Sequence, residues 1–176
     1  MHRVPFIVTE RLNLHKIDEG HCNETYLTWL HDKEVSKYLE TGRFPQSIKD
    51  LQNFVTNTEK QETLFLAIHT QKDDKHIGNI KIDTINRVHQ RAEYGILIGD
   101  KESWGKGYGT EASIAIINHC FNILNLRKIT LGVIAENVGA VRLYEKLGFV
   151  KEGLYKDHDF CCGKYVDILR MAIFRS

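Results

Sequence analysis

The sequence is poor in the features that mark linkers, membrane spans and signal peptides. Proline occurs only twice among the 176 residues, at Pro5 and Pro45, so no segment has the composition of a proline-rich linker. The longest apolar stretch, residues 112–126, is interrupted by polar side chains and falls short of the roughly 18 apolar residues of a membrane span. Residues 1–10 contain no apolar run suited to a signal peptide. We therefore expect one domain, residues 1–176, in a cytoplasmic protein without a membrane partner.

The sequence also has few cysteines and a net charge close to zero. The four cysteines include no C-x-x-C spacing, and the nine histidines include no pair at metal-ligand spacing, so we expect reduced thiols and no metal site. Lys and Arg number 24 and Asp and Glu number 23, a formal net charge of +1. This near balance disfavours a protein whose main partner is nucleic acid. Apolar residues at 42% and charged residues at 27% are the proportions of an ordinary globular domain.

The hydrophobic pattern predicts an α+β fold. Alternating or short apolar runs predict strands, and these strands cover residues 11–17, 63–69, 76–82, 92–98, 128–133, 149–156 and 165–174. Wider periodicity and capping residues predict helices, and these helices cover residues 21–30, 34–39, 48–60, 110–124 and 137–147. The order strand, helix, strand over residues 92–133 predicts one parallel strand pair. The strands before it, joined by short turns, predict an antiparallel meander, so the sheet should be mixed.

A glycine cluster, Trp-Gly-Lys-Gly-Tyr-Gly-Thr at residues 104–110, lies between a predicted strand and a predicted helix that should be buried on two faces. Glycine lets the backbone approach a ligand closely, and the N–H groups at a helix N-terminus favour anions. The spacing differs from both the Walker A loop and the Rossmann G-x-G-x-x-G loop. The cluster therefore indicates a phosphate or pyrophosphate site of another kind, and a plain tight turn is the alternative.

A second segment opens a helix at Asn137 and places Tyr144 two turns into it, on a face shared with Ala140, Val141 and Leu147. A phenol has a reference pKa near 10, which suits a proton donor to a leaving thiolate. The alternative is a core helix with a tyrosine at its edge.

In this order and spacing, the glycine cluster and the pattern Asn-x-x-Ala-x-x-Leu-Tyr-x-x-x-Gly-Phe at residues 137–149 resemble the GNAT superfamily of acyl-CoA-dependent N-acyltransferases. The opening Thr-Glu-Arg-Leu-Asn-Leu at residues 9–14 resembles the RimJ/RimL-like subgroup, which includes spermidine acetyltransferases. The resemblance spans residues 11–174. It implies a single GNAT-like domain, with a mostly antiparallel sheet, splayed parallel strands and flanking helices.

The resemblance also implies acetyl-CoA as cosubstrate and no metal. Main-chain groups of the strand at residues 96–98 would hold the pantetheine arm, and backbone N–H groups of the glycine cluster would hold the pyrophosphate. Trp104 stands where the family often has Arg or Gln, so its side chain brings no charge to the phosphates. The expected cofactor-binding residues are Ile96, Leu97, Ile98, Trp104, Gly105, Lys106, Gly107, Tyr108, Gly109, Thr110, Asn137, Ala140 and Tyr144.

For catalysis, the resemblance implies direct attack of an amine on the thioester, with Tyr144 as general acid near the sulfur. Glu93 is the candidate general base, directly or through water, and the alternative for Glu93 is an ion pair with Arg91. A backbone N–H of Leu97 or Ile98 would stabilise the oxyanion.

The acceptor is less defined by sequence. Glu34, Tyr38 and Glu40 are the expected substrate-binding residues, and Phe44, Asp157 and Asp159 belong to the same segments. We expect a small amine, a polyamine or amino sugar. A protein N-terminal acetyltransferase, a non-catalytic acyl-CoA-binding regulator and a nucleotide-binding module remain alternatives. A homodimer formed at residues 165–174 is also expected.

Overall fold

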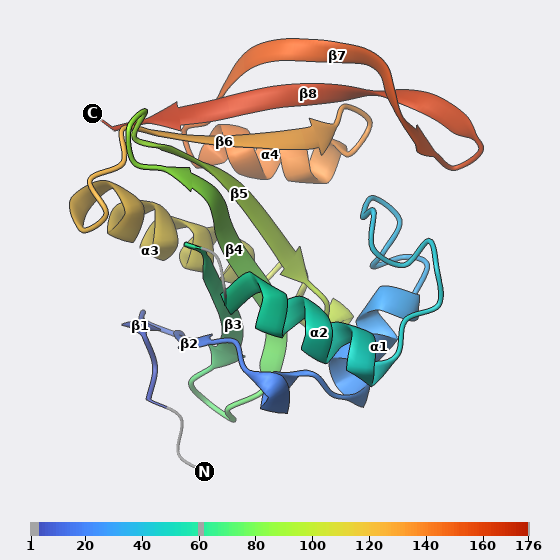
Figure 1. Ribbon diagram of the computed structural model, residues 1–176, viewed down its shortest axis with the longest axis vertical. Coiled ribbons are helices and arrows are strands. Elements are labelled where there is room, and N and C mark those ends of the chain that lie inside the picture. Colours follow the sequence, from blue (N-terminus) through green and yellow to red (C-terminus); the bar gives the residue numbers. More distant parts are fainter. Residues whose placement is uncertain (1–3, 60–61, 176) are drawn as a thin grey trace.

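The computed structural model describes residues 4–59 and 62–175, and its eight strands form one twisted sheet (Figure 1). The strand order is β1-β2-β3-β4-β5-β6-β8-β7. The strands are β1 Ile7–Val8, β2 Leu12–Lys16, β3 Leu64–Thr70, β4 His76–Asn86, β5 Arg91–Ile98, β6 Lys128–Ile134, β7 Val150–Cys161 and β8 Lys164–Phe174. The helices are α1 Glu24–His31, α2 Ile48–Glu59, α3 Tyr108–Asn122 and α4 Val138–Lys146, with single 3₁₀ turns η1 Glu19–His21 and η2 Lys101–Ser103.

The predicted mixed sheet is confirmed. Among the described strands, β5 and β6 pair in parallel and every other neighbouring pair is antiparallel. The parallel pair arises because α3 carries the chain from the end of β5 back to the start of β6, as a crossover connection must.

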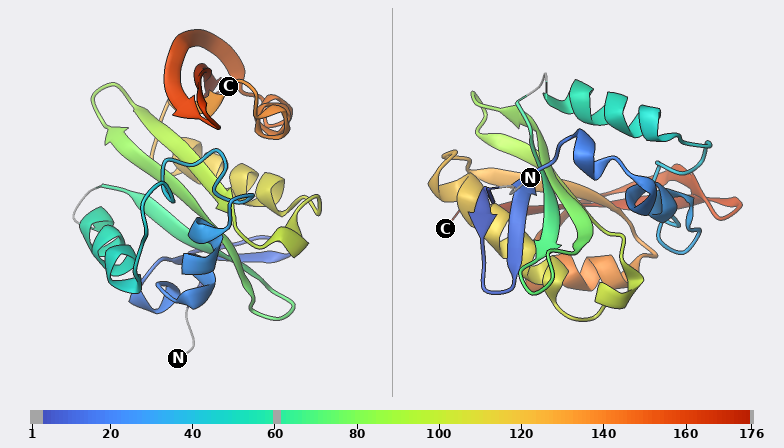
Figure 2. Two further views of the ribbon diagram at one scale, coloured as in Figure 1. Left: turned by 90° about the vertical axis from the view of Figure 1, so that its right-hand side faces the viewer. Right: turned by 90° about the horizontal axis from the view of Figure 1, so that it is seen from below.

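Helices cover both faces of the sheet, with α1 and α2 on one side and α3 and α4 on the other (Figure 2). The sequence of β3 is a nearly continuous apolar run because both faces of this strand are buried. Phe65 and Ala67 pack in the cluster that contains α1 and α2, whereas Leu66 and Ile68 pack in the cluster that contains α3. Alternate residues of one strand thus serve two cores.

Helix α2, predicted over residues 48–60, begins at Ile48 directly after Ser47, and residue 60 lies outside the described residues. The backbone N–H of Asp50 donates to Ser47 Oγ at 3.2 Å, and the backbone N–H of Ser47 donates to Asp50 Oδ2 at 2.8 Å. This reciprocal pair satisfies two donors that the first helical turn would leave open, so Asp takes the place of the usual Glu.

Three expectations about the elements are wrong. Residues 34–39 form turns instead of a helix, because the Asp32 carboxylate accepts the backbone N–H of Glu34 at 2.8 Å and fixes a turn there. Helix α3 is not buried on two full faces, since Ile114 is 50% exposed and Ile123 is 70% exposed. The homodimer expected at residues 165–174 finds no open strand edge there, because β8 pairs with β6 and β7.

Of the helices in the described ranges 4–59 and 62–175, none is both long and apolar enough to cross a membrane.

Candidate active site

The site begins where β5 and β6 separate. The two strands pair in parallel for only three residue pairs, from Arg91–Lys128 to Glu93–Thr130. Beyond these pairs, β5 stays with β4 to its end at Ile98, whereas β6 stays with β8 to its end. The sheet therefore opens into a V, and the second half of β5 turns its backbone toward the gap instead of toward β6. The expectation of splayed parallel strands is confirmed.

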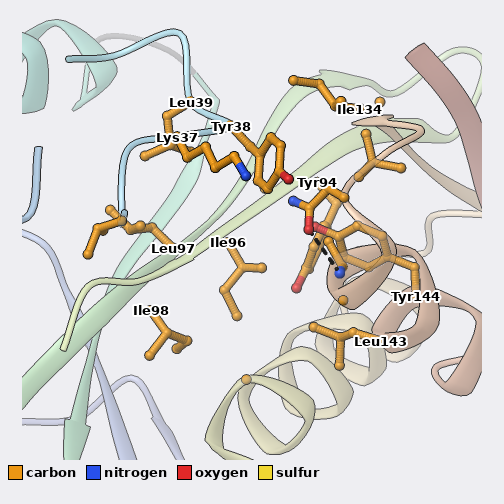
Figure 3. Close-up of a pocket in the computed structure, with 18 of the residues that line it drawn as sticks. Lys37, Tyr38, Leu39, Tyr94, Ile96, Leu97, Ile98, Ile134, Leu143 and Tyr144 are labelled. Atoms are coloured by element: carbon orange, nitrogen blue, oxygen red, sulfur yellow. Dashed lines mark hydrogen bonds between the residues drawn. The ribbon is translucent and has the colours of Figure 1, made fainter. Parts of the chain in front are cut away.

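A cavity of about 960 Å³ occupies this opening. Its walls come from β5, β6, the glycine cluster, α4, the segment before α2, and the β7–β8 hairpin. In Figure 3, Ile96 and Ile98 of β5 face the α4 side of the cavity, where Leu143 and Tyr144 lie. Leu97 points the other way, toward Leu39 (Figure 3). The alternation of β5 thus gives the cavity two ends of different composition.

At the first end, the glycine cluster forms the N-terminus of α3. Gly105 and Gly107 have φ values of +71° and +82°, the left-handed region that side chains disfavour, and Gly107 is the N-cap. The first intrahelical bond runs from the N–H of Glu111 to the carbonyl of Gly107. The N–H groups of the preceding helical residues therefore have no acceptor within the helix and can bind an anion.

Arg11 of the segment before β2 clamps this cluster, a role that the sequence did not reveal. Its guanidinium donates to the Lys106 carbonyl at 3.0 Å and to Glu111 Oε2 at 2.7 Å, and it lies 4.7 Å from the ring centre of Tyr108. Thr9 donates to the same Glu111 carboxylate at 2.6 Å. These bonds, together with the Trp104 indole N–H that donates to the Ile98 carbonyl at 2.8 Å, hold the loop against the sheet.

Asn137 lines the cavity and caps α4. Its side-chain oxygen accepts the backbone N–H of Ala140 at 3.3 Å. The cap fixes the start of α4 beside the gap between β5 and β6, and the helix then carries Tyr144 to the cavity wall.

Tyr144 is buried, at 8% exposure, and its ring packs edge-on to Tyr94 with ring centres 5.9 Å apart. Phe149 packs on the same ring at 5.8 Å. Burial raises the pKa of Tyr144 to about 12. The phenol therefore carries its proton throughout the neutral range, the state that a proton donor requires.

Glu93 lies at the floor of the cavity, but its carboxylate is engaged. Arg170 donates to it from Nη1 and Nη2, at 2.7 and 2.9 Å, and the Thr130 hydroxyl donates at 2.6 Å. The ion pair raises the pKa of Arg170 further. Arg170, on β8, takes the place of the expected partner Arg91, and no pattern near Glu93 in the sequence pointed to it.

The second end of the cavity carries more acidic than basic side chains. Among the described lining residues, the carboxylates are Glu34, Glu40, Glu93 and Asp159, and the permanent cations are Lys37 and Arg170. The Lys37 ammonium lies over the Tyr38 ring, 4.9 Å from its centre (Figure 3). Glu93 is paired with Arg170, and Glu34 accepts from the Lys101 ammonium at 3.2 Å, so Glu40 and Asp159 are the carboxylates of this end that can attract a cationic ligand.

The structure brings most of the sequence-predicted residues together around the cavity. Lining residues among them are Glu34, Tyr38, Glu40, Glu93, Ile96, Leu97, Ile98, Trp104, Gly105, Gly109, Thr110, Asn137, Ala140, Tyr144 and Asp159. The residues outside the lining are Phe44, Lys106, Gly107, Tyr108 and Asp157. Those that sequence reasoning missed include Lys37, Tyr155, His158 and Arg170, which come from segments without a local motif.

Comparison with known proteins agrees with this geometry. A sequence model of the acetyltransferase (GNAT) domain matches residues 11–150. The chain is 30% identical over 173 residues to N-acetyltransferase p20 of Bacillus licheniformis, covering 96% of both chains. It is 39% identical over 118 residues to the spermidine N(1)-acetyltransferase of Vibrio cholerae serotype O1, covering 67% of this chain and 66% of that protein.

The fold is also similar to a crystal structure of spermidine N-acetyltransferase from Vibrio cholerae in complex with CoA and spermine. The TM-score is 0.85 at 28% identity, covering 94% of this chain and 96% of that one. The matching domain, the splayed strands and the glycine cluster at a helix N-terminus agree on one assignment. The chain belongs to the GNAT family and is an acetyl-CoA-dependent N-acetyltransferase.

Proposed function

We propose that this N-acetyltransferase acetylates a primary amine of a small polycation, with polyamines as the substrate class. The observation that carries the proposal is the pair of carboxylates Glu40 and Asp159 in the cavity lining, beside the ion pairs that Glu93 forms with Arg170 and Glu34 forms with Lys101. A polyamine is a flexible chain of ammonium groups, so it gains from two separated carboxylates at once. Sequence and structural similarity to spermidine acetyltransferases supports the same class.

For acetyl-CoA, we propose the first end of the cavity. The backbone of β5 at residues 96–98 would pair with the amide groups of the pantetheine arm. The N–H groups at the start of α3 would bind the pyrophosphate, because Gly109 leaves open space there: an added Cβ would meet only Ile98, Ile96 and Leu143, at 3.7 to 3.9 Å. Asn137 and Ala140 lie on the wall between these two groups.

In the proposed reaction, the neutral amine attacks the thioester carbonyl, and a C–N bond forms as the C–S bond breaks. A backbone N–H of Leu97 or Ile98 stabilises the oxyanion. The amine loses one proton to a base, and Tyr144 gives one proton to the departing sulfur, so charge and atoms balance. Because burial keeps the phenol protonated, Tyr144 can supply this proton at neutral pH.

The base is Glu93 in this proposal, acting through a water molecule. Three donors already engage its oxygens, so the carboxylate is held in one orientation toward the cavity. Bulk water as the acceptor of the amine proton is the alternative, and a Glu93→Gln variant separates the two. A fall in kcat with an unchanged KM for acetyl-CoA supports Glu93, and an unchanged kcat assigns the proton to water.

An amine panel tests the substrate class. Thiol release from acetyl-CoA is measured with spermidine, spermine, glucosamine and a peptide with a free N-terminus. We expect kcat/KM to be highest for spermidine or spermine, because they alone carry several ammonium groups. A peptide or glucosamine with the highest kcat/KM would overturn the proposal in favour of a protein or amino-sugar acetyltransferase. A thermal shift with acetyl-CoA against ATP controls for the cofactor.

We also propose a homodimer, now through the true edge strand β7 instead of β8. Along β7, Val150, Leu154 and Tyr155 are 54%, 44% and 49% exposed, an apolar strip on an unpaired edge. Light scattering at micromolar concentration tests this, and a monomer mass would refute it.

A further inference from the structure

Three side chains meet at the point where β5 and β6 separate. Thr130 of β6 lies opposite Glu93 of β5 in the last pair of the parallel ladder, and its hydroxyl donates to Glu93 Oε2 at 2.6 Å. Arg170 comes from β8, on the far side of β6. Its Nη1 and Nη2 reach Oε1 and Oε2 of the same carboxylate, at 2.7 and 2.9 Å. The carboxylate of β5 is thus bonded to both strands that form the other arm of the V.

Gly132 makes room for this contact. In the ladder between β6 and β8, Gly132 lies directly opposite Arg170. A Cβ added at Gly132 would lie 2.9 Å from Arg170 Nη1 and 3.2 Å from Ile168 Cγ2, which is closer than such atoms pack. The guanidinium therefore crosses β6 over the bare backbone of this glycine to reach Glu93, and a side chain at this position would displace it.

The pair of Glu93 and Arg170 is suited to fixing the two arms of the V. The two side chains are 34% and 27% exposed, so water only partly screens their charges. A bidentate contact between arginine and a carboxylate sets orientation as well as distance, which a single-point ion pair does not. Among the described residues, the ladder between β5 and β6 ends at Glu93 and Thr130, so this contact lies at the vertex of the V.

The opening of the V determines how the two sides of the cavity face each other. The backbone of residues 96–98, proposed to hold acetyl-CoA, belongs to the β5 arm. Asn137 follows the end of β6 and caps α4, which carries Tyr144 to the cavity wall. A change in the angle between β5 and β6 would therefore move the Tyr144 hydroxyl relative to a thioester bound along β5. A misplacement of about 1 Å can cost about 100-fold in rate.

We propose that Arg170 is a positioning residue for acetyl transfer. By binding Glu93 across Gly132, it fixes the separation of β5 and β6 and so sets the acetyl-CoA side of the cavity against α4. The inference rests on the proposed placement of acetyl-CoA along β5, but it does not require Glu93 to be the general base.

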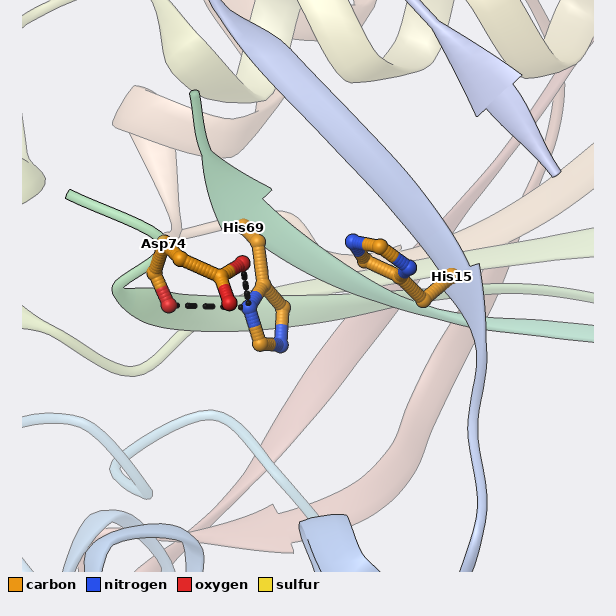
Figure 4. Close-up of side chains that lie close together, drawn as sticks. All are labelled: His15, His69 and Asp74. Carbon is orange, nitrogen blue, oxygen red and sulfur yellow. Dashed lines mark hydrogen bonds and ion pairs between the residues drawn. The ribbon is translucent and has the colours of Figure 1, made fainter. Parts of the chain in front are cut away.

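A second charged contact within the sheet provides a control. The Nδ1–H of the buried His69 donates to the carbonyl oxygen and to the Oδ1 of Asp74, both at 3.0 Å (Figure 4). This contact closes the turn between β3 and β4, and neither residue lines the acetyl-transfer cavity. Asp74→Asn removes the charge, and Asn suits the φ of +50° at this position. The variant therefore shows what the loss of a charged contact elsewhere in the sheet does to activity.

Steady-state kinetics of Arg170→Met and Gly132→Ala test the proposal, with the amine that gives the highest kcat/KM. Both variants should lower kcat about 10- to 100-fold and leave the KM for acetyl-CoA within about threefold of the parent, because the glycine cluster is unchanged. Gly153→Ala is the matched control: Gly153 of β7 pairs with Arg170 from the other side, and an added Cβ there meets nothing within 4 Å. Gly153→Ala and Asp74→Asn should keep the kcat of the parent.

The double variant Arg170→Met/Gly132→Ala separates positioning from a general loss of stability. Without the guanidinium, the methyl group added at Gly132 has nothing charged to displace. The double variant should therefore match Arg170→Met within about twofold in kcat. A parent-like kcat in Arg170→Met, or two losses that multiply in the double variant, would overturn the proposal. If Arg170→Met does not fold by circular dichroism, Gly132→Ala decides alone, since it keeps both charges.

Glu93→Gln distinguishes this proposal from the general-base proposal. Gln keeps an oxygen that can accept from Arg170, so the contact between the strands persists while the base is lost. An unchanged kcat in Glu93→Gln, with a lowered kcat in Arg170→Met and Gly132→Ala, would refute Glu93 as base and support Arg170 as a positioning residue. A parent-like kcat in all three variants would refute both proposals.

Discussion

The two ends of the cavity differ in how they are built. At the end proposed for acetyl-CoA, the glycine cluster and the open edge of β5 present main-chain groups, which Arg11 and Trp104 hold in place. At the end proposed for the acceptor, separate side chains converge from residues 34–40 and from the β7–β8 hairpin. The comparison teaches that recognition by backbone depends on one continuous segment, whereas recognition by side chains depends on how distant segments meet. The predictions below test this difference.

The largest effect is expected where both ends meet, at Tyr144. Tyr144→Phe should lower kcat by about 10²- to 10⁴-fold, because it removes the proton donor and keeps the ring that packs on Tyr94 and Phe149. Steady-state kinetics at saturating acetyl-CoA measures the change. Since the pKa of Tyr144 is about 12, the parent should show no loss of kcat from phenol ionisation below about pH 11.

A loss of less than threefold in Tyr144→Phe, with an unchanged melting temperature, would make the tyrosine a packing residue. The affinity for acetyl-CoA serves as control and should stay near the parent value, because the proposed reaction places the hydroxyl beside the departing sulfur and not along the pantetheine or pyrophosphate groups.

Acid should lower the stability of the whole domain and so affect both ends of the cavity together. Burial, with smaller contributions from His69 and His21, lowers the pKa of His76 to about 4 from 6.5. Between pH 6.5 and 4, His76 is therefore protonated in the unfolded chain and neutral in the folded chain. The free energy of unfolding should fall by about 3 kcal/mol as pH drops through this range, which is a few hundred-fold in the unfolding equilibrium constant. Urea unfolding at several pH values measures this, and His76→Gln should flatten the dependence. An equal slope in that variant would assign the effect to other groups.

At the cofactor end, Gly109→Val should raise the KM for acetyl-CoA by about 100-fold, because the added methyl groups enter the space that the pyrophosphate needs. The fold should tolerate the change, since an added Cβ meets its neighbours at ordinary contact distances of 3.7 Å or more. Gly107→Val is a less clean test because its φ of +82° strains any side chain. The matched control is Gly153→Val in β7, where a Cβ meets nothing within 4 Å. Calorimetry with acetyl-CoA decides, and parent-like binding by Gly109→Val would remove the loop from the site.

Arg11→Met should have a smaller effect, roughly a tenfold higher KM for acetyl-CoA with little change in kcat. Arg11 acts through the loop by binding Glu111 and the Lys106 carbonyl, so only the positions of the N–H groups should change. Arg87→Met is the control, because that residue makes an exposed ion pair with Glu62 outside the cavity. A fall in kcat without a change in KM would contradict a positioning role.

The smallest effect is expected at the acceptor end. Glu40→Gln should raise the KM for spermidine about two- to fivefold and leave the KM for acetyl-CoA unchanged, because single solvent-accessible charges contribute little each. Glu102→Gln, an exposed carboxylate outside the cavity lining, is the control. An effect on acetyl-CoA but not on spermidine would reverse the assignment of the two ends.

Local patterns were enough for most strands and helices. Alternation located β2 and β4 and an apolar run located β5, each to within a few residues, and the helix predicted over residues 48–60 matches the start of α2. The pattern failed at residues 34–39, because the Asp32 carboxylate accepts the backbone N–H of Glu34 and fixes a turn where the apolar spacing predicted a helix. It also missed β1, whose two residues are too short to show any period.

The sequence by itself determined the fold class, the glycine cluster at a helix N-terminus, and the positions of Asn137 and Tyr144, because each depends on neighbours within a few residues. Only the tertiary structure decided that Arg170 pairs with Glu93, that Arg11 clamps the glycine cluster, and that three histidines of separate strands meet under α1. These contacts depend on sheet register and strand order, which bring together residues separated by tens of positions in the chain. No local period or spacing records such contacts, because the free energy that selects them comes from packing of the whole domain.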